Sequence, residues 1–358
     1  MKGALKEYLR ETGVLLEEQR KLDPPFPYET AELMEGTYAY FLRGGKRLRP
    51  ALCRMAAGAL GGEAAERAAL PCALGLEYYH NWTLIHDDVL DHDDLRRGKP
   101  AVHTLTTDRF REESGADAAG EYGLDLAILA GDALHSAAIR AIAGAKNVSP
   151  EVTLAILRLL EGEYGPRLIE GETVDTKNGV LYGKGRFAGI SRDTALGVIR
   201  GKTGALFAIA AGSGGMIGQS RAEETPEIRA LFDFAEACGI AFQLQDDILG
   251  LTSTDGTLGK PVCSDIREGK PTVLLLTSFA NATEEERAFL LETVGRRAGD
   301  EQVEKARRIL LARGGVEESR RLADESIRKA NGCLAVLAPS RWRDLLEAWR
   351  DAMVDRDH

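Results

Sequence analysis

Three aspartates interrupt an otherwise apolar segment, and their carboxylates are candidate metal ligands. The segment, residues 80–100, reads HNWTLIHDDVLDHDDLRRGKP and contains Asp87, Asp88 and Asp91. If residues 82–90 are helical, Asp87 and Asp91 lie one turn apart on one face, with their Cβ atoms roughly 5–6 Å apart. Carboxylates that close repel each other, and Mg²⁺ typically binds one or two carboxylates together with the oxygens of a substrate phosphate. A solvated helix face is the alternative interpretation of such a cluster.

A second acidic pair favours the metal interpretation. Residues 226–251 have the apolar spacing of a helix, and near its end Gln243, Asp246 and Asp247 share one face. Carboxylates in an apolar helix need partners, because a buried charge without one is costly. We therefore expect the aspartates of both helices to bind divalent metal ions.

Basic residues beside glycines are candidate phosphate ligands. Residues 44–50, GGKRLRP, include Lys46 and Arg49, and Arg96 and Arg97 follow the acidic segment. A glycine-rich loop lets backbone N–H groups and cations approach a phosphate together, and a guanidinium can bind phosphate through two hydrogen bonds. A helix that stops at Gly-Gly before basic residues is the alternative interpretation of residues 44–50.

Further candidates lie around these motifs. His80 is seven residues before Asp87, two turns away and nearly on the same face, although a lone histidine is more often a structural donor. Lys260 and Lys270 each follow a glycine in a loop-like region. Residues 201–204, GKTG, resemble the end of a P-loop but lack the glycine that this motif requires upstream, so we reject a P-loop.

The remaining pattern predicts one all-α domain over residues 1–358. Helical patterns recur along the whole chain, and no run of β-branched residues with a period of two, internal repeat or linker interrupts them. Loops are expected at residues 44–50, 177–191 and 251–272 because glycine, proline and polar residues gather there.

The composition excludes several classes of protein. A net charge of −10 argues against nucleic acid as a general partner. The five cysteines show neither CxxC spacing nor a secretory pattern, so no zinc site or disulfide framework is indicated. Residues 1–20 fit an amphipathic helix better than a signal peptide, and the apolar residues 205–218 are too few for a membrane span and include glycines. We expect a cytoplasmic protein with no transmembrane segment.

Five motifs taken together resemble those of the trans-isoprenyl diphosphate synthases. They are GGKRLRP, DDVLD followed by DDLRRGKP, GKTGALF, FQLQDDILG and GKPVCSDIREGKPT, in the order and approximate spacing of that family. The resemblance covers residues 41–272. It implies a bundle of long helices around a deep central cavity, usually as a homodimer. It also implies condensation of isopentenyl diphosphate with an allylic diphosphate, with three Mg²⁺ ions.

The resemblance implies a role for each candidate residue. The metal ligands would be Asp87, Asp88, Asp91, Asp246 and Asp247. The allylic diphosphate would be bound by Arg96, Lys202 and Lys260, with Lys270 as a further substrate-binding residue. Isopentenyl diphosphate would be bound by Lys46, Arg49, His80 and Arg97. Thr203 and Gln243 would line the reacting carbons, where polar oxygen atoms can stabilise a cation.

Two residues depart from the family pattern. Gly250 stands where many members have a third aspartate in the second acidic motif, a change that is common in short-chain members. Glu172 stands where the family usually carries glutamine, in a GQxxD pattern that ends at Asp175. A glutamate there is expected to be protonated or paired with a lysine.

The length of the product is predicted from the residues before Asp87. Trp82 precedes it by five residues, about 7.5 Å along a helix axis, and in this family a bulky aromatic residue at that place stops chain growth early. Trp82 lies about 140° around the helix from Asp87, whereas the small Thr83 is only about 40° away. Ordinary core filler is the alternative interpretation of Trp82. With one large and one small residue we favour geranylgeranyl diphosphate (C20) over farnesyl diphosphate (C15).

Two further functions remain as alternatives. A terpene cyclase also ionises a prenyl diphosphate with aspartates, but it needs no second diphosphate site, so Lys46, Arg49 and Arg97 argue against it. A non-catalytic subunit of a heteromeric synthase is expected to lose the motif aspartates, and this chain retains the essential ones.

Overall fold

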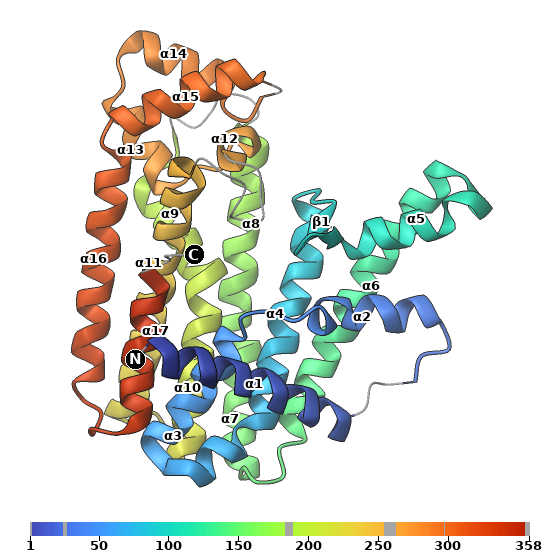
Figure 1. Ribbon diagram of the computed structural model, residues 1–358, viewed down its shortest axis with the longest axis vertical. Helices are drawn as coiled ribbons and strands as arrows, with labels where there is room; N and C mark the ends of the chain where they lie inside the picture. The colour runs from blue at the N-terminus through green and yellow to red at the C-terminus, as the bar shows by residue number, and fades with distance from the viewer. Residues whose placement is uncertain (1, 24–26, 183–188, 254–262, 297, 355–358) are drawn as a thin grey trace. The chain divides into compact units, whose positions relative to one another are not determined.

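The chain is mostly helical wherever the computed structural model describes it, at residues 2–23, 27–182, 189–253, 263–296 and 298–354 (Figure 1). This confirms the predicted all-α class. The first helices are α1 (Lys2–Leu22), α2 (Ala31–Leu42), α3 (Leu48–Ala68), α4 (Leu70–Leu90), α5 (Val102–Ser114), α6 (Ala116–Ala143), α7 (Pro150–Leu159) and α8 (Gly165–Tyr182). The later ones are α9 (Arg192–Val198), α10 (Ala205–Gln219), α11 (Pro226–Thr252), α12 (Ser264–Glu268), α13 (Val273–Asn281), α14 (Glu284–Thr293), α15 (Asp300–Ala312), α16 (Gly315–Leu334) and α17 (Arg341–Val354). Two π-helical segments are η1 (Leu160–Tyr164) and η3 (Ile199–Gly204).

The chain folds into two compact units. Unit 1 comprises Met1–Leu160, Ala210–Arg229 and Leu337–Ala348, and unit 2 comprises Glu161–Ile209, Ala230–Val336 and Trp349–His358. Each unit therefore combines segments that are far apart in the sequence. The expectation of a single domain stays a prediction.

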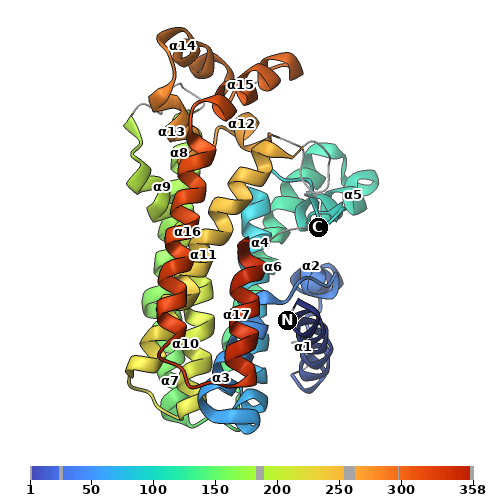
Figure 2. The ribbon, with the colours of Figure 1, turned by 60° about the vertical axis from the view of Figure 1, so that its left-hand side comes forward.

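Helix α4 is a central element of unit 1 and lies beside α6 (Figures 1 and 2). Pro71 lies in its first turn, where the missing N–H has no helical partner to lose. Every residue from Cys72 to Tyr79 is buried, and the Tyr79 ring contacts His135 of α6 at 5.3 Å between centroids. This packing fixes the direction of α4, so its C-terminal end presents the three aspartates.

A small hairpin after α4 was not predicted. Strands β1 (Leu95–Arg96) and β2 (Lys99–Pro100) pair antiparallel, with Arg96 opposite Lys99. The two turn residues, Arg97 and Gly98, both have positive φ, at 55° and 72°. Positive φ at both positions matches the right-handed twist of paired strands and is typical of two-residue hairpin turns. The pairing is too short to produce a period-two pattern, which is why the sequence did not reveal it.

In unit 2, segment η3 packs closely against α8 because two glycines meet. A Cβ added to Gly201 would lie 2.6 Å from the Arg167 carbonyl oxygen and 3.0 Å from the Gly171 Cα. A Cβ added to Gly171 would lie 2.6 Å from the backbone nitrogen of Lys202. A side chain at either glycine would therefore separate the two elements. Their contact places Lys202 directly against α8.

The C-terminal end of α11 packs into an apolar core within unit 2. Helices α12, α13, α14 and α15 gather beyond one end of α11 and α16 (Figure 2). Ile248 of α11 is buried in this core together with Ile266, Leu274 and Leu290. Because Ile248 follows the second acidic pair directly, its burial sets the orientation of those aspartates.

The three predicted loops are shorter than expected. Helix α3 begins at Leu48, α8 continues to Tyr182, and α12 lies inside the third predicted loop. Pro50 fits in the first turn of α3 because N–H groups there have no partner within the helix. Residues 183–188 and 254–262, which include Lys260, lie outside the described residues.

Two described helical stretches have the length and composition of a membrane span. They are Ala116–Ala143 and Arg192–Gln219, whose most apolar windows are 50% and 72% buried inside the protein. An apolar helix that packs inside a soluble protein passes the same test. The stretch is longer than the apolar residues 205–218 because α9, η3 and α10 follow one another without a break.

Candidate active site

Asp87 and Asp88 lie in the last turn of α4, and Asp91 is its C-cap residue. The backbone N–H of Asp91 donates to the Asp87 carbonyl oxygen at 2.8 Å, so the two residues are one helical turn apart. The side chain of Asp87 is only 17% exposed, and its Oδ2 lies 3.9 Å from the Arg96 guanidinium. Asp87 and Asp91 therefore lie on one face at the end of the helix, and Asp87 lies next to a cation.

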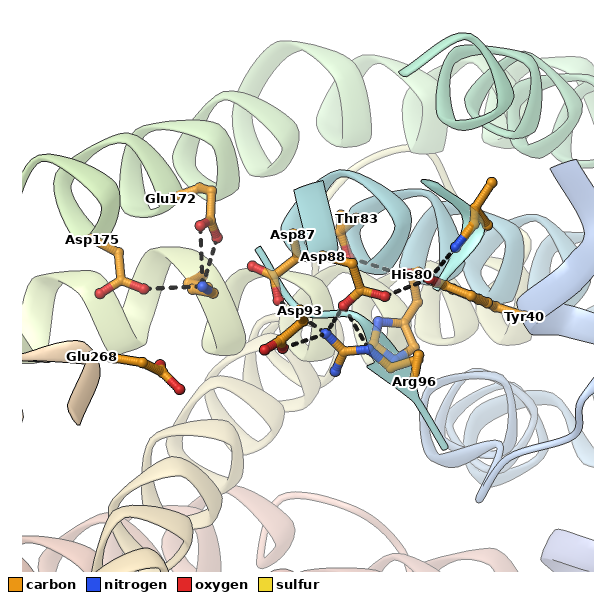
Figure 3. Close-up of polar contacts among 12 residues, drawn as sticks. Tyr40, His80, Thr83, Asp87, Asp88, Asp93, Arg96, Glu172, Asp175 and Glu268 are labelled. Carbon is orange, nitrogen blue, oxygen red and sulfur yellow. Dashed lines mark hydrogen bonds and ion pairs between the residues drawn. The ribbon is translucent and has the colours of Figure 1, made fainter. Parts of the chain in front are cut away.

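Asp88 has a different environment from Asp87 (Figure 3). Its side chain is fully buried, and both oxygens accept hydrogen bonds from protein groups. Nε of Arg96 donates to Oδ1 at 2.7 Å, a second Arg96 nitrogen donates to the same oxygen, and the Tyr40 hydroxyl donates to Oδ2. Desolvation raises the pKa of Asp88, while the hydrogen bonds from Arg96 and Tyr40 oppose that change. We expected Asp88 to bind metal, but these contacts do not support that role, because both oxygens are already engaged.

Cations gather around His80, on the same helix as the aspartates. Four arginine side chains lie close enough to act on the ring electrostatically: Arg49, Arg97, Arg96 and Arg47. Desolvation, and then these positive charges, lower the pKa of His80 well below its usual value. Desolvation also lowers the pKa of Arg49 to about 10, although Glu77 opposes it. So many cations near a neutral histidine favour an anionic ligand.

The backbone around this cationic group is unusual. Arg97 and Arg47 both have left-handed φ, at 55° and 52°. Arg97 donates to the Tyr40 carbonyl oxygen at 3.0 Å and also to that of Gly44, which fixes its guanidinium beside the loop before α3. Non-glycine residues with positive φ are uncommon and gather at functional sites, where the surrounding structure holds them.

Arg47 belongs to the cationic group around His80 and was not among the predicted site residues. Its side chain is buried and pairs with Glu77 at 2.5 Å, and it donates to the Phe41 carbonyl oxygen at 2.7 Å. The predicted Lys46 is exposed, and Arg49 lies in the first turn of α3. Nothing in the local pattern separates the buried Arg47 from its exposed neighbour. Tyr40 was missed for the same reason, since a tyrosine in an apolar helix is ordinary core.

In unit 2, Lys202 is held by two carboxylates of α8. Its Nζ lies 2.9 Å from Oε2 and 3.1 Å from Oε1 of Glu172, and 3.0 Å from Oδ2 of Asp175 (Figure 3). The prediction that Glu172 is either protonated or paired with a lysine is confirmed in its second form. Lys202 lies in a π-helical segment, not in a loop after a strand, so the rejection of a P-loop is also confirmed.

A chain of hydrogen bonds connects η3 to α11. The Thr203 hydroxyl donates to Oε1 of Gln243 at 3.1 Å, and Nε2 of Gln243 donates to Oδ1 of Asp247 at 3.0 Å. The predicted side chains Thr203, Gln243 and Asp247 are therefore brought together. The partly buried Asp246 lies next to this chain on α11. The amide of Gln243 is oriented by both its partners.

The environment of Asp247 suits a cation. Desolvation, and then the carboxylates of Asp265 and Asp175, raise the pKa of Asp247 to about 8, although the Gln243 hydrogen bond and Lys270 oppose this. A positive ion beside such a group would favour its charged form. Among the described residues, no group of three or more His, Cys, Asp or Glu side chains forms a complete metal site. Mg²⁺ does not need one, since water and phosphate oxygens supply its other ligands.

The remaining predicted residues are Lys270, Trp82 and Thr83. Lys270 pairs with Glu268 at 2.9 Å. Trp82 makes edge contacts with the rings of Tyr79 and His135, each at 4.7 Å between centroids, and its buried Nε1 has no hydrogen-bond partner within the described part of the chain. Thr83 donates to the His80 carbonyl oxygen at 2.7 Å. The tryptophan thus fills the contact between α4 and α6.

Comparison with known proteins identifies the family. A family model described as "Polyprenyl synthetase" matches residues 31–310, and the chain belongs to that family. The structure of geranylgeranyl pyrophosphate synthetase from Pyrococcus horikoshii is similar with a TM-score of 0.84 and 32% identity, over 99% of this chain and 98% of that one. The geranylgeranyl pyrophosphate synthase from Corynebacterium glutamicum, complexed with isoprenyl diphosphate and magnesium, has a TM-score of 0.84 and 27% identity, over 98% and 99%. The protein is a prenyltransferase with the isoprenoid synthase fold.

Relatives named for different products are about equally similar to this chain. The geranylgeranyl diphosphate synthase of Sulfolobus acidocaldarius is 35% identical over 76% of this chain and 75% of that one. The farnesyl diphosphate synthase of Geobacillus stearothermophilus is 35% identical over 75% and 82%. The geranylfarnesyl diphosphate synthase of Aeropyrum pernix is 32% identical over 91% and 95%. Membership of the family therefore establishes prenyl diphosphate condensation but not the length of the product.

Proposed function

We propose that the protein condenses isopentenyl diphosphate head-to-tail with an allylic diphosphate in a Mg²⁺-dependent reaction and that its main product is geranylgeranyl diphosphate. The observation that carries this proposal is the presence of two candidate phosphate sites on α4. One is the cationic group around His80, and the other is the pair Asp87 and Asp91 with Arg96 beside it. An enzyme with two diphosphate substrates needs both phosphate sites, whereas a terpene cyclase needs only one.

The metal ions would be held by aspartates, and we expect three ions. Asp87 and Asp91 are the ligands in unit 1, and Asp246 and Asp247 are those in unit 2. Mg²⁺ bound there would neutralise the charge that develops on the departing diphosphate. Support comes from the raised pKa of Asp247, which indicates that this carboxylate is in need of a positive partner.

Lys46, Arg49, His80 and Arg97 are proposed to bind isopentenyl diphosphate. Because its pKa is lowered, His80 is neutral at pH 7 and would act as a hydrogen-bond donor. The arginines would supply the charge, and each guanidinium can bind phosphate through two hydrogen bonds. The Arg97 guanidinium is already held by two backbone carbonyl oxygens, those of Tyr40 and Gly44.

Lys202, Lys260, Lys270 and Arg96 are proposed to bind the allylic diphosphate. Asp88 and Tyr40 are then positioning residues, since their hydrogen bonds hold the Arg96 guanidinium near Asp87. Thr203 and Gln243 would lie beside the reacting carbons, where their oxygens stabilise the allylic cation. The cation adds to the double bond of isopentenyl diphosphate, and the departed diphosphate removes the proton.

Replacing Trp82 with alanine should lengthen the product beyond C20. Its indole fills the space between α4 and α6 within two turns of Asp87, so its loss should let the prenyl chain grow further along α4. Products from Trp82→Ala and the wild type would be sized by chromatography. The control Trp82→Phe keeps an aromatic ring and should give the wild-type product. An unchanged distribution for Trp82→Ala would show that other residues limit the chain.

We also propose that the protein forms a homodimer. Helix α6 exposes three large apolar side chains, Leu124, Ile128 and Leu129, which are 41%, 45% and 55% exposed. Contiguous exposed apolar side chains on a long helix are typical of surfaces that bind a partner. A second copy of this chain is the partner that the resemblance implies.

One assay tests the proposed function. Purified protein would be incubated with Mg²⁺, isopentenyl diphosphate and, separately, dimethylallyl, geranyl or farnesyl diphosphate. We expect condensation and a main product of C20. A main product of C15 would contradict the proposed chain length, and no condensation with any allylic substrate would contradict the proposed reaction.

A further inference from the structure

Arg47 and Glu77 form a buried ion pair that the proposed mechanism does not use. Their side chains are only 4% and 3% exposed, and Nη1 of Arg47 lies 2.5 Å from Oε1 of Glu77. Nη2 of Arg47 donates to the Phe41 carbonyl oxygen at 2.7 Å, and its guanidinium carbon lies 4.5 Å from the centre of the Phe41 ring. The guanidinium is therefore held by a carboxylate, a carbonyl oxygen and an aromatic ring.

The ion pair connects α4 to a loop with an unusual backbone. Gly44, Gly45 and Arg47 have positive φ, at 83°, 149° and 52°. Glycine adopts such angles readily, but an arginine keeps one only where surrounding contacts hold it. Arg47 is the N-cap residue of α3, so its conformation sets the start of that helix and the position of Arg49 in its first turn.

The same loop holds Arg97. The Arg97 guanidinium donates to the carbonyl oxygens of Tyr40 and Gly44. A Cβ added to Gly45 would lie 3.0 Å from both terminal nitrogens of Arg97, so the guanidinium lies directly against the backbone of the loop. A displaced loop would therefore move two of the proposed ligands of isopentenyl diphosphate, Arg49 and Arg97.

Glu77 also supplies negative charge to these arginines. Burial lowers the pKa of Arg49 and that of Arg97, and the Glu77 carboxylate opposes both changes. Glu77 precedes His80 by three residues, so both lie on the same side of α4. Its Oε1 accepts from Asn81 at 3.2 Å as well as from Arg47, which fixes the carboxylate.

We propose that Glu77 and Arg47 are positioning residues, whose ion pair holds residues 44–47 on α4 and thereby places Arg49 and Arg97 beside His80. This inference rests on the proposed function, in which these three side chains bind isopentenyl diphosphate. Neither member of the ion pair contacts substrate in this role. Its loss should therefore weaken the binding of isopentenyl diphosphate and spare that of the allylic diphosphate.

Three variants separate positioning from stability of the fold. Glu77→Gln leaves Arg47 buried without its counter-charge, which is destabilising. The double variant Arg47→Met with Glu77→Leu replaces both charges by apolar side chains, a change that is often neutral or stabilising for a buried ion pair. Glu66→Gln is the matched control, because Glu66 and Arg54 form another buried pair in unit 1, with side chains 7% and 2% exposed, outside the proposed site.

Steady-state kinetics with each substrate varied in turn measure the effect. KM for isopentenyl diphosphate should rise about tenfold in Glu77→Gln and in the double variant, the effect of losing one hydrogen bond to a charged group. KM for the allylic diphosphate should stay within about twofold of the wild type in both. Calorimetric titration with isopentenyl diphosphate should show the same loss of affinity. In urea, Glu77→Gln and Glu66→Gln should unfold earlier than the wild type and the double variant should not, whereas Glu66→Gln should keep both KM values.

Several results would overturn the inference. A double variant with wild-type stability and wild-type KM for isopentenyl diphosphate would show that the ion pair serves only the fold. Equal rises in KM for both substrates would indicate a general distortion, and an equal rise in Glu66→Gln would attribute the effect to lost stability. If the double variant does not fold, the comparison of Glu77→Gln with Glu66→Gln decides. A wild type that forms no prenyl product would instead contradict the proposed function itself.

Discussion

Replacing Asp87 with asparagine should lower kcat/KM for condensation by about 10³-fold, because charge stabilisation of a leaving group in a preorganised site contributes on this order. Asp87 lies in the last turn of α4, and Asp91 is the C-cap residue one turn further on. Asp87 Oδ2 lies 3.9 Å from the Arg96 guanidinium, beyond hydrogen-bond distance, and Asp88 remains as the main counter-charge of Arg96, so the free energy of unfolding should change little. Steady-state kinetics with both substrates, together with urea denaturation, would measure the two quantities.

The control for this experiment is Asp94→Asn. The Asp94 side chain is 83% exposed, and it belongs to the same acidic segment. We expect wild-type kinetics from it, because a solvated carboxylate outside the last turn of α4 has no role in the proposed mechanism. Asp87→Asn with a kcat/KM within about tenfold of the wild type would remove Asp87 from the proposed metal ligands.

Replacing Asp88 with asparagine should instead lower the free energy of unfolding by about 3–5 kcal/mol, the usual result of removing one partner of a buried ion pair. The Asp88 side chain is 0% exposed and Arg96 is 16% exposed, so the variant leaves a largely buried guanidinium without its main counter-charge. Activity should also fall, because Arg96 loses the contact that orients it. Urea denaturation would give the stability change, and kinetics with the allylic substrate varied would show the loss of orientation.

Asp93→Asn provides the matched comparison. Asp93 contacts the same guanidinium at 3.4 Å, but its side chain is 24% exposed, whereas that of Asp88 is fully buried. Its substitution should cost at most about 1 kcal/mol, as expected for a partly solvated pair. If Asp88→Asn unfolds at the same urea concentration as the wild type, Asp88 is not the structural partner that its contacts indicate.

The sequence could not distinguish the role of Asp87 from that of Asp88. Both residues are aspartates in one motif, and the sequence assigned both to metal. Their positions differ by about 100° around the helix axis. Asp87 faces the end of α4, whereas Asp88 faces α2 and the hairpin. Only the packing of those elements shows that Asp88 accepts hydrogen bonds from Tyr40 and Arg96.

The sequence by itself determined what depends on spacing along one helix. The all-α class, the one-turn separation of Asp87 and Asp91 and the shared face of Gln243 and Asp247 follow from the helical period, and the structure has all three. The departure of Glu172 from the glutamine usual in the family was visible in the sequence, and pairing with a lysine was one of the two outcomes expected for its carboxylate.

The tertiary structure alone decided which residues meet across large separations in sequence. Tyr40 reaches Asp88 over 48 residues, and Lys202 reaches Glu172 over 30. The gathering of four arginines around His80 and the glycine contact between α8 and η3 likewise depend on how helices pack. Periodicity shows which face of a helix is apolar but not which helix covers it. Contacts between helices therefore had to come from the fold, and they decide which of the predicted site residues bind and which hold others in place.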